Sequence, residues 1–400
     1  MVSWVIYDLA NTVFALGVVG LYLPDWMTRQ GLPDTALAVT QAFAGAVVIV
    51  AAPWVGARTD HSGRRLPTLM FTTLVAVAAT AWLAAGPTWL TFLLLGAAVA
   101  AVNIGSVVYD ALLGDVSTPH TRGRVSGWGV GVGYLGSFLG VGIGWVTLDV
   151  AGWTHTATFR TLAAAFLLFS LPAFLWIEER PRPRPSGPPP RLGSVLVDLV
   201  RSWRRARSHP PVFRFLLGRL LYTDAINTLI GGFLAIYALE ELGFDRRSSA
   251  DLLAMAIGGA VLGGVGGGRL VTRFGASTVL RAALVMWIVA IGFGVAAAWL
   301  DVELLAWAIG PMGGFALGAT WTSDRVMMVE LSPPERLGEF YGLYATVGRF
   351  ATVTGPLVWA AVVDLLGWGR PTALGTLGLL VAAGWWVIGT VERIATANGG

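Results

Sequence analysis

The sequence predicts an all-α integral membrane protein with twelve transmembrane helices in two six-helix parallel repeats. Hydrophobic residues make up 55% of the 400 positions and charged residues only 12%, about half the charged fraction of a soluble domain. The mean hydropathy is +0.69. The apolar runs are continuous and about as long as a helix that crosses a bilayer, so alternating β-barrel strands are not expected.

The composition excludes several classes of function. Without cysteine there is no disulfide framework, thiolate metal site or cysteine nucleophile. All 27 basic residues are arginine, so the lysine of an ATP-binding phosphate loop is missing. The four histidines share no metal-ligand spacing, and we expect neither a metal nor another cofactor. No HExxH or GxSxG motif is present, which argues against a membrane enzyme.

The net charge of +4 is not a signal for nucleic acid, because the arginines lie in short loops where the positive-inside rule accounts for them. A literal GxGxxG at residues 131–136 follows no predicted strand. It therefore favours close helix packing through small residues over nucleotide binding.

Six apolar runs precede a region rich in proline and arginine. The first run is expected to end at Pro24, and an amphipathic stretch is expected near 192–203 within the linker. We predict a six-helix bundle over 1–177, a cytoplasmic linker over 178–211 and a second six-helix bundle over 212–400. The first six helices are expected near 3–23, 35–57, 66–85, 89–112, 125–148 and 158–177.

The second half repeats the first at a nearly constant offset. Asp8 and Asp224 are 216 residues apart, as are Asn11 and Asn227. The loops after the fourth and tenth runs match at an offset of 215, with Pro119 on Pro334, Gly123 on Gly338 and Gly127 on Gly342. Two parallel repeats are typical of transporters with a substrate site near the middle of the membrane, between the halves.

A short charged loop, Gly56–Arg65, separates the second and third runs. Five of its ten residues are Asp, His or Arg. One interpretation is a positive loop that only fixes topology. The other is a latch between two helices, because an Asp at a helix start can accept hydrogen bonds from unpaired amides and is favoured by the helix dipole. Residue 272, at the place of the second half that matches Asp60, is a threonine.

These motifs together resemble the major facilitator superfamily over essentially the whole chain. The narrower likeness is to the branch of autophagy-related vacuolar amino-acid effluxers and their bacterial relatives. The first helix departs slightly from that branch, with Leu9 where an aromatic residue is common and Thr12 where serine is. The residues that carry the resemblance are Ser3-Trp4 with Tyr7-Asp8-x-Ala10-Asn11, Pro53-x-x-Gly56-Ala57, Asp60 with Gly63-Arg64-Arg65, Asp110 to Asp115, Arg122 to Gly127 and Gly133 to Gly136.

The resemblance implies a secondary active transporter that moves a small polar solute, an amino acid or another organic anion, by alternating access. Coupling to protons is one version of this hypothesis. The alternatives are a non-transporting receptor or scaffold and a drug/proton antiporter, although Tyr134 follows Gly133 where the antiporter signature has proline. We expect a monomer in the lipid bilayer of a bacterial cytoplasmic membrane, with both termini cytoplasmic.

Ionisable residues inside predicted spans are the candidates for chemistry, because placing one there costs about 2.5–3.5 kcal/mol. Asp8 and Asp224 either bind substrate or a proton, or form structural hydrogen bonds. Arg349 lies about 16 Å into its helix, where it either binds a carboxylate or phosphate or pairs with Asp224 or Asp8. The candidates are Asp8, Asn11, Asn103, Tyr134, Asp224, Asn227 and Arg349.

A second group of residues is expected to form a cytoplasmic gating latch and its copy in the second half. These residues flank the inner loops after the second, fourth, eighth and tenth runs. They are Gly56, Asp60, Gly63, Arg64, Arg65, Asp110, Asp115, Arg122, Arg124, Arg273, Asp324, Arg325, Glu330 and Arg336.

Overall fold

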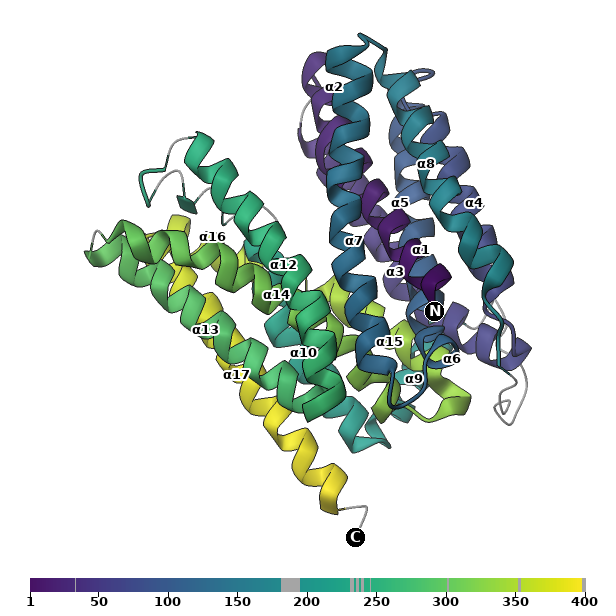
Figure 1. Cartoon of the computed structure of the whole chain (residues 1–400), viewed down its shortest axis with the longest axis vertical. Helices are drawn as coiled ribbons and strands as arrows, with labels where there is room; N and C mark the ends of the chain where they lie inside the picture. The colour runs from purple at the N-terminus through teal and green to yellow at the C-terminus, as the bar shows by residue number, and fades with distance from the viewer. Residues whose placement is uncertain are drawn as a thin grey trace. The chain divides into compact units, whose positions relative to one another are not determined.

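The computed structural model confirms an all-helical chain, and its described part contains no β-strand (Figure 1). Ten of the described helices are long and apolar enough to cross a membrane. The shorter α4 and the charged α10 occupy the places of the third and seventh spans. The structure describes the chain except for residues 33, 181–194, 231–233, 235–236, 239–240, 245, 301, 352–353 and 398–400, and some further side chains within helices.

The first half of the chain forms six spans. The first is continuous from Val2 to Arg29, with a π-helical segment in its middle. The bounds are α1 Val2–Thr12, η1 Val13–Tyr22, α2 Leu23–Arg29, α3 Asp34–Ser62, α4 Leu66–Ala81, α5 Thr88–Ala111, α6 Leu113–Val116, α7 Arg122–Gly144, η2 Trp145–Val150 and α8 His155–Trp176.

The second half follows the same order after the linker helix. The bounds are α9 Val195–Arg207, α10 Pro210–Thr228, α12 Arg246–Phe274, α13 Ala276–Leu300, α14 Glu303–Leu331, η5 Pro334–Arg336, α15 Leu337–Phe350, α16 Thr354–Ala360, η6 Ala361–Leu365 and α17 Arg370–Ala397.

Several of the expected boundaries are wrong. The second helix does not end near residue 57 but continues to Ser62, so most of the predicted charged loop Gly56–Arg65 forms the last turns of α3. Pro24 does not end the first helix, which continues to Arg29. Pro24 comes directly after the π-helical turns, where the regular i→i−4 pattern is already interrupted, so its missing N–H breaks no regular bond. The amphipathic linker helix begins at Val195 and ends at Arg207, later than the expected 192–203, and residues 192–194 lie outside the described residues.

The chain divides into two compact units that do not follow the sequence halves strictly. Unit 1 comprises Met1–Pro119, Trp128–Val200 and Pro333–Ala345. Unit 2 comprises His120–Gly127, Arg201–Ser332 and Thr346–Gly400. Each unit therefore contains one short segment that the sequence repeat assigns to the other half.

Glycines allow helices within unit 1 to approach closely. On α7, a Cβ atom at Gly136 would lie 2.4 Å from the carbonyl oxygen of Leu9 in α1. This contact confirms that the GxGxxG segment packs helices. On α3, a Cβ atom at Gly56 would lie 2.0 Å from the carbonyl oxygen of Gly338, at the start of α15. Gly342 meets Pro53 and Ala52 one turn further on.

Replacing Gly56 with alanine is expected to destabilise the protein, because overpacking a tight contact costs roughly 1–3 kcal/mol. The matched control is Gly45→Ala on the same helix, where a Cβ atom meets nothing within 4 Å. The control should be neutral or slightly stabilising, since alanine favours the helix. Thermal unfolding in detergent compares the two variants. Equal melting temperatures would mean that the Gly56 contact does not constrain the fold.

Candidate functional site

The centre of the candidate latch is a buried guanidinium. Arg65 has no exposed surface. Its Nη2 donates to Asp60 Oδ1 at 2.9 Å, and its Nη1 donates to the carbonyl oxygen of Ala111 at 2.8 Å, with Asp115 Oδ2 at 3.5 Å. Because a buried charge is costly unless it is paired and hydrogen-bonded, these contacts make Arg65 tenable and join the ends of α3, α4 and α5.

Asp60 also binds the start of α15. Its Oδ1 accepts from the backbone N–H of Gly338 at 3.0 Å, and its Oδ2 accepts from that of Glu339 at 2.8 Å. These amides belong to the first turn of the helix, where backbone donors lack intrahelical partners and the dipole favours a negative charge. One carboxylate therefore joins Arg65 to a helix that is 278 residues away in sequence.

Two residues that the sequence analysis did not select complete this cluster. The backbone N–H groups of Arg65 and Leu66, at the start of α4, both donate to Glu179 Oε1. Arg180 Nη1 donates to the carbonyl oxygen of Ser117 at 2.9 Å. Their signal in the sequence is an acidic and a basic residue directly after the sixth span. Both residues fall within the predicted linker over 178–211.

The matching contact in unit 2 has Thr272 where unit 1 has Asp60. A Cβ atom at Gly123 would lie 2.8 Å from the carbonyl oxygen of Gly268, and one at Gly127 would lie 2.5 Å from that of Gly264. Ser126 Oγ donates to the carbonyl oxygen of Thr322 at 2.9 Å. The start of α7 thus packs on α12 as the start of α15 packs on α3, with a threonine in the place of the capping aspartate.

A buried ion pair lies within unit 2. Arg219 on α10 pairs through Nη1 with Asp324 Oδ2 on α14 and donates to Thr223 Oγ1 at 3.0 Å. Tyr222 OH donates to Asp324 Oδ1 at 2.6 Å. The guanidinium also lies 5.7 Å from the ring centre of Trp321. Asp324 is a predicted member of the second latch, whereas its ion-pair partner Arg219 is not among the predicted site residues.

The same place in unit 1 holds an aromatic pair. Residues 4 and 109 precede residues 219 and 324 by the repeat offset of 215. The Trp4 and Tyr109 rings are stacked with centres 4.5 Å apart. Trp4 Nε1 donates to the carbonyl oxygen of Tyr109 at 2.9 Å, and Tyr109 OH donates back to that of Trp4 at 3.0 Å. Unit 2 therefore carries an ion pair where unit 1 has a neutral contact.

The first-span candidates lie against α7. Asp8 is buried, and a Cβ atom at Gly133 would lie 3.4 Å from its Cγ. Asn11 Oδ1 is buried and receives no hydrogen bond from the part of the chain that the structure describes. Asn103 Nδ2 donates to the carbonyl oxygen of Val99 at 2.7 Å. Tyr134, on α7, is half-buried.

The corresponding candidates of unit 2 lie on α10 and α15. Asp224 is buried, and its backbone carbonyl accepts from Thr228 Oγ1 at 2.8 Å. Asn227 and Arg349 are half-buried. The residue before Arg349 is Gly348, where a Cβ atom would lie 3.5 Å from Arg219 Nη2. The last turn of α15 is therefore next to the buried ion pair.

The remaining latch candidates differ in exposure. Asp110 is buried, and Gly63 adopts a positive φ of 70° where the chain turns after α3. Arg336 Nη1 donates to Glu339 Oε2 at 3.2 Å. Arg64, Arg124, Arg273 and Glu330 are exposed, and Arg122, Arg325 and Arg336 are half-buried.

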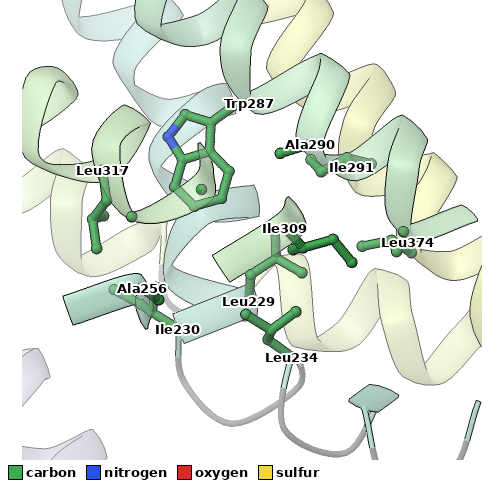
Figure 2. A pocket seen from close by; sticks show the side chains of 13 residues that line it. Leu229, Ile230, Leu234, Ala256, Trp287, Ala290, Ile291, Ile309, Leu317 and Leu374 are labelled. Atoms are coloured by element: carbon green, nitrogen blue, oxygen red, sulfur yellow. The ribbon is translucent and has the colours of Figure 1, made fainter. Parts of the chain in front are cut away.

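An apolar pocket of about 490 Å³, counted with the space at its mouth, lies in unit 2 (Figure 2). It is lined by α12, α13, α14, α17 and the residues that follow α10, with Leu229, Trp287, Ile309 and Leu374 around it. None of the described residues that line the pocket has an ionisable side chain. These residues therefore offer no charged group to a polar solute. Among the described residues, no cluster of His, Asp or Glu could hold a metal ion.

Solved structures place this architecture in a class. The match with the human organic anion transporter MFSD10 (TETRAN) has a TM-score of 0.74 at 17% identity and covers 96% of this chain and 97% of that protein's chain. The match with the Escherichia coli fucose:proton symporter FucP has a TM-score of 0.72 at 16% identity and covers 97% of this chain and 96% of that of FucP. The chain thus has the twelve-helix fold of the major facilitator superfamily, and it is a multi-pass membrane protein.

Sequence comparisons define the branch. The model of the family described as "Vacuole effluxer Atg22 like" matches residues 115–393. The chain belongs to this family. It is 27% identical to an uncharacterized MFS-type transporter, YxiO of Bacillus subtilis (strain 168), over 96% of this chain and 92% of that protein. Autophagy-related protein 22 of Coccidioides immitis is 29% identical over 64% of this chain, which spans only 46% of that fungal protein.

Removing one partner of the ion pair, as in Arg219→Leu, should cost about 3–5 kcal/mol, because a buried Asp324 would lose its countercharge. The double variant Arg219→Trp with Asp324→Tyr installs the pair that unit 1 uses at these positions. It should recover much of the lost stability in thermal unfolding. If the single variant is as stable as the wild type, the pair does not hold α10 against α14.

Proposed function

We propose that the chain is a secondary active transporter that moves a small polar solute across the membrane by alternating access. The observation that carries the proposal is the contact of Asp60 with both Arg65 and the start of α15. A contact that consists of a few directional bonds at a helix end can form in one conformation and break in another. Such a contact stabilises one of the two conformations and so shifts the equilibrium between them. The name of the relative YxiO, an MFS-type transporter, supports the same class.

The substrate-binding and proton-coupling residues that we propose are the polar side chains inside the spans. In unit 1 they are Asp8 and Asn11, together with Asn103 and Tyr134. A buried acceptor without a hydrogen bond costs about 1–3 kcal/mol, so Asn11 Oδ1 is a natural place for a solute or a water molecule. The candidates of unit 2 are Asp224, Asn227 and Arg349.

Transport is tested directly by reconstituting the purified protein into liposomes. A mixture of metabolites rich in amino acids and organic anions is loaded on one side, with and without a pH gradient. We expect one class of small polar solute to cross faster than in empty liposomes. If no solute moves under either condition while a ligand binds, a receptor is the better description. If a substrate is chemically converted, the chain is an enzyme rather than the carrier that we propose.

Arg349 is proposed to bind an anionic group of the solute. Its planar guanidinium can hold a carboxylate through two parallel hydrogen bonds, which lysine cannot do. Arg349→Lys should therefore lower transport strongly, by about tenfold or more, and Arg349→Gln should abolish it, while both variants fold. Uptake and melting temperature are measured together. Full activity in Arg349→Gln would remove Arg349 from the site.

We further propose a bacterial cytoplasmic membrane location with both termini and the linker on the cytoplasmic side, as the arginine-rich inner loops favour. Because the chain lacks cysteine, a single Ser208→Cys variant can be labelled selectively. Ser208 is exposed, between α9 and α10. An impermeant thiol reagent added to intact cells should not reach it. Labelling from outside would reverse the proposed orientation.

A further inference from the structure

The linker helix α9 and the first turns of α10 form a basic surface. Between Arg201 and Arg219 the chain has six arginines and no acidic residue. Four of them have exposed side chains: Arg201, Arg204 and Arg207 on α9 and Arg214 on α10. A concentration of like charge at one end of a membrane-spanning helix is attracted to an anionic membrane surface.

The exposed face of α9 carries both apolar and charged side chains. Val197 and Val200 are both 51% exposed. At 3.6 residues per turn, these valines lie on the same face as Arg201, Arg204 and Arg207. The opposite face packs against the protein, with Ser202 and Ala206 buried. The exposed side of α9 therefore presents guanidinium groups together with apolar side chains, and both kinds of group can contact the interface of a bilayer.

Contacts hold α9 beside the point where α10 begins. Only two residues separate the end of α9 at Arg207 from Pro210. The Trp203 ring packs edge-on against the Phe213 ring at 6.5 Å, and the Arg207 guanidinium lies 5.6 Å from the centre of the same ring. The C-terminal half of α9 is therefore fixed next to the first turn of a membrane-spanning helix.

The first turns of α10 continue the pattern. Arg214 and Leu217 are both exposed and lie three residues apart, on one face of the helix. A guanidinium followed one turn later by an exposed leucine is the order in which a helix passes from headgroups into hydrocarbon.

We propose that Arg201, Arg204, Arg207 and Arg214 form a binding surface for the headgroups of anionic phospholipids in the leaflet that α10 enters. A guanidinium group can donate two parallel hydrogen bonds to the oxygens of one phosphate. The valines of α9 would reach the upper part of the acyl chains. Each basic residue near an anionic bilayer adds to this attraction. The inference needs α10 to span a membrane, but it does not depend on what the chain transports.

The test uses the full-length protein with Val200→Cys as its single cysteine, labelled with an environment-sensitive fluorophore. The labelled protein is reconstituted into phosphatidylcholine vesicles with increasing amounts of phosphatidylglycerol. Emission should shift to shorter wavelength as phosphatidylglycerol increases, and high salt should reverse the shift because it screens the charges. Emission that is the same with and without phosphatidylglycerol would overturn the proposal.

A pair of variants separates this surface from general positive charge. Arg204→Gln with Arg214→Gln should raise the phosphatidylglycerol fraction at half-maximal shift by about fivefold or more. The control, Arg58→Gln with Arg269→Gln, removes two exposed guanidinium groups elsewhere and should leave the shift unchanged. Equal losses in both variants would contradict the proposal. A shift with soluble polyglutamate in phosphatidylcholine, but none with phosphatidylglycerol, would assign the surface to an acidic protein instead.

Discussion

The carboxylate of Asp60 is the interaction on which the candidate latch depends. One oxygen accepts from Arg65 and from the amide of Gly338, and the other accepts from the amide of Glu339. Each of these groups would be costly to leave unpaired in a buried place. The arrangement is stable as a whole, yet it consists of only a few directional bonds, so a small movement of the start of α15 would break several of them together.

The two repeats share a plan but differ in charge. Glycines bring helix starts close to α3 in unit 1 and to α12 in unit 2, and unit 1 adds the carboxylate of Asp60 where unit 2 has Thr272. The reverse holds where the first helix of each repeat meets the fourth: unit 2 has the Arg219–Asp324 pair there and unit 1 the stacked Trp4 and Tyr109. The close glycine contacts occur at matching positions of both repeats, whereas the charged residues differ between them. The charged positions are therefore the places where the two units have acquired separate roles.

The sequence predicted the fold well, for physical reasons. Long continuous apolar runs, the arginine bias of short loops and the offset of 215 residues are each strong signals of a twelve-helix repeat. Boundaries were less secure, as at Pro24, because a local π-helical register removes the usual cost of proline. Asp60 was selected because its charged segment interrupts long apolar runs, although the segment up to Ser62 forms the last turns of α3 rather than a loop.

The partners of individual charges were harder to predict. Arg219 lies near enough to the predicted start of its span to resemble an inner-loop arginine, and only the fold brings α14 against it. Glu179 was hidden by the neighbouring proline-rich linker. In both cases the sequence shows the charged residue but not which group lies close to it in space, because partners about a hundred residues apart meet only through tertiary packing. Arg349 was found because its charge lies about 16 Å into a predicted span, and the residue 215 positions earlier is Tyr134.

Backbone hydrogen exchange at the start of α15 measures the Asp60 interaction most directly. In Asp60→Asn, a peptide covering residues 337–345 should exchange roughly tenfold faster or more than in the wild type, because a charge-assisted hydrogen bond to a helix amide is lost. A peptide covering residues 123–127, which belongs to unit 2, should be unchanged. Unaltered protection of residues 337–345 would contradict the account, since Asp60 would then hold neither the helix start nor a conformation.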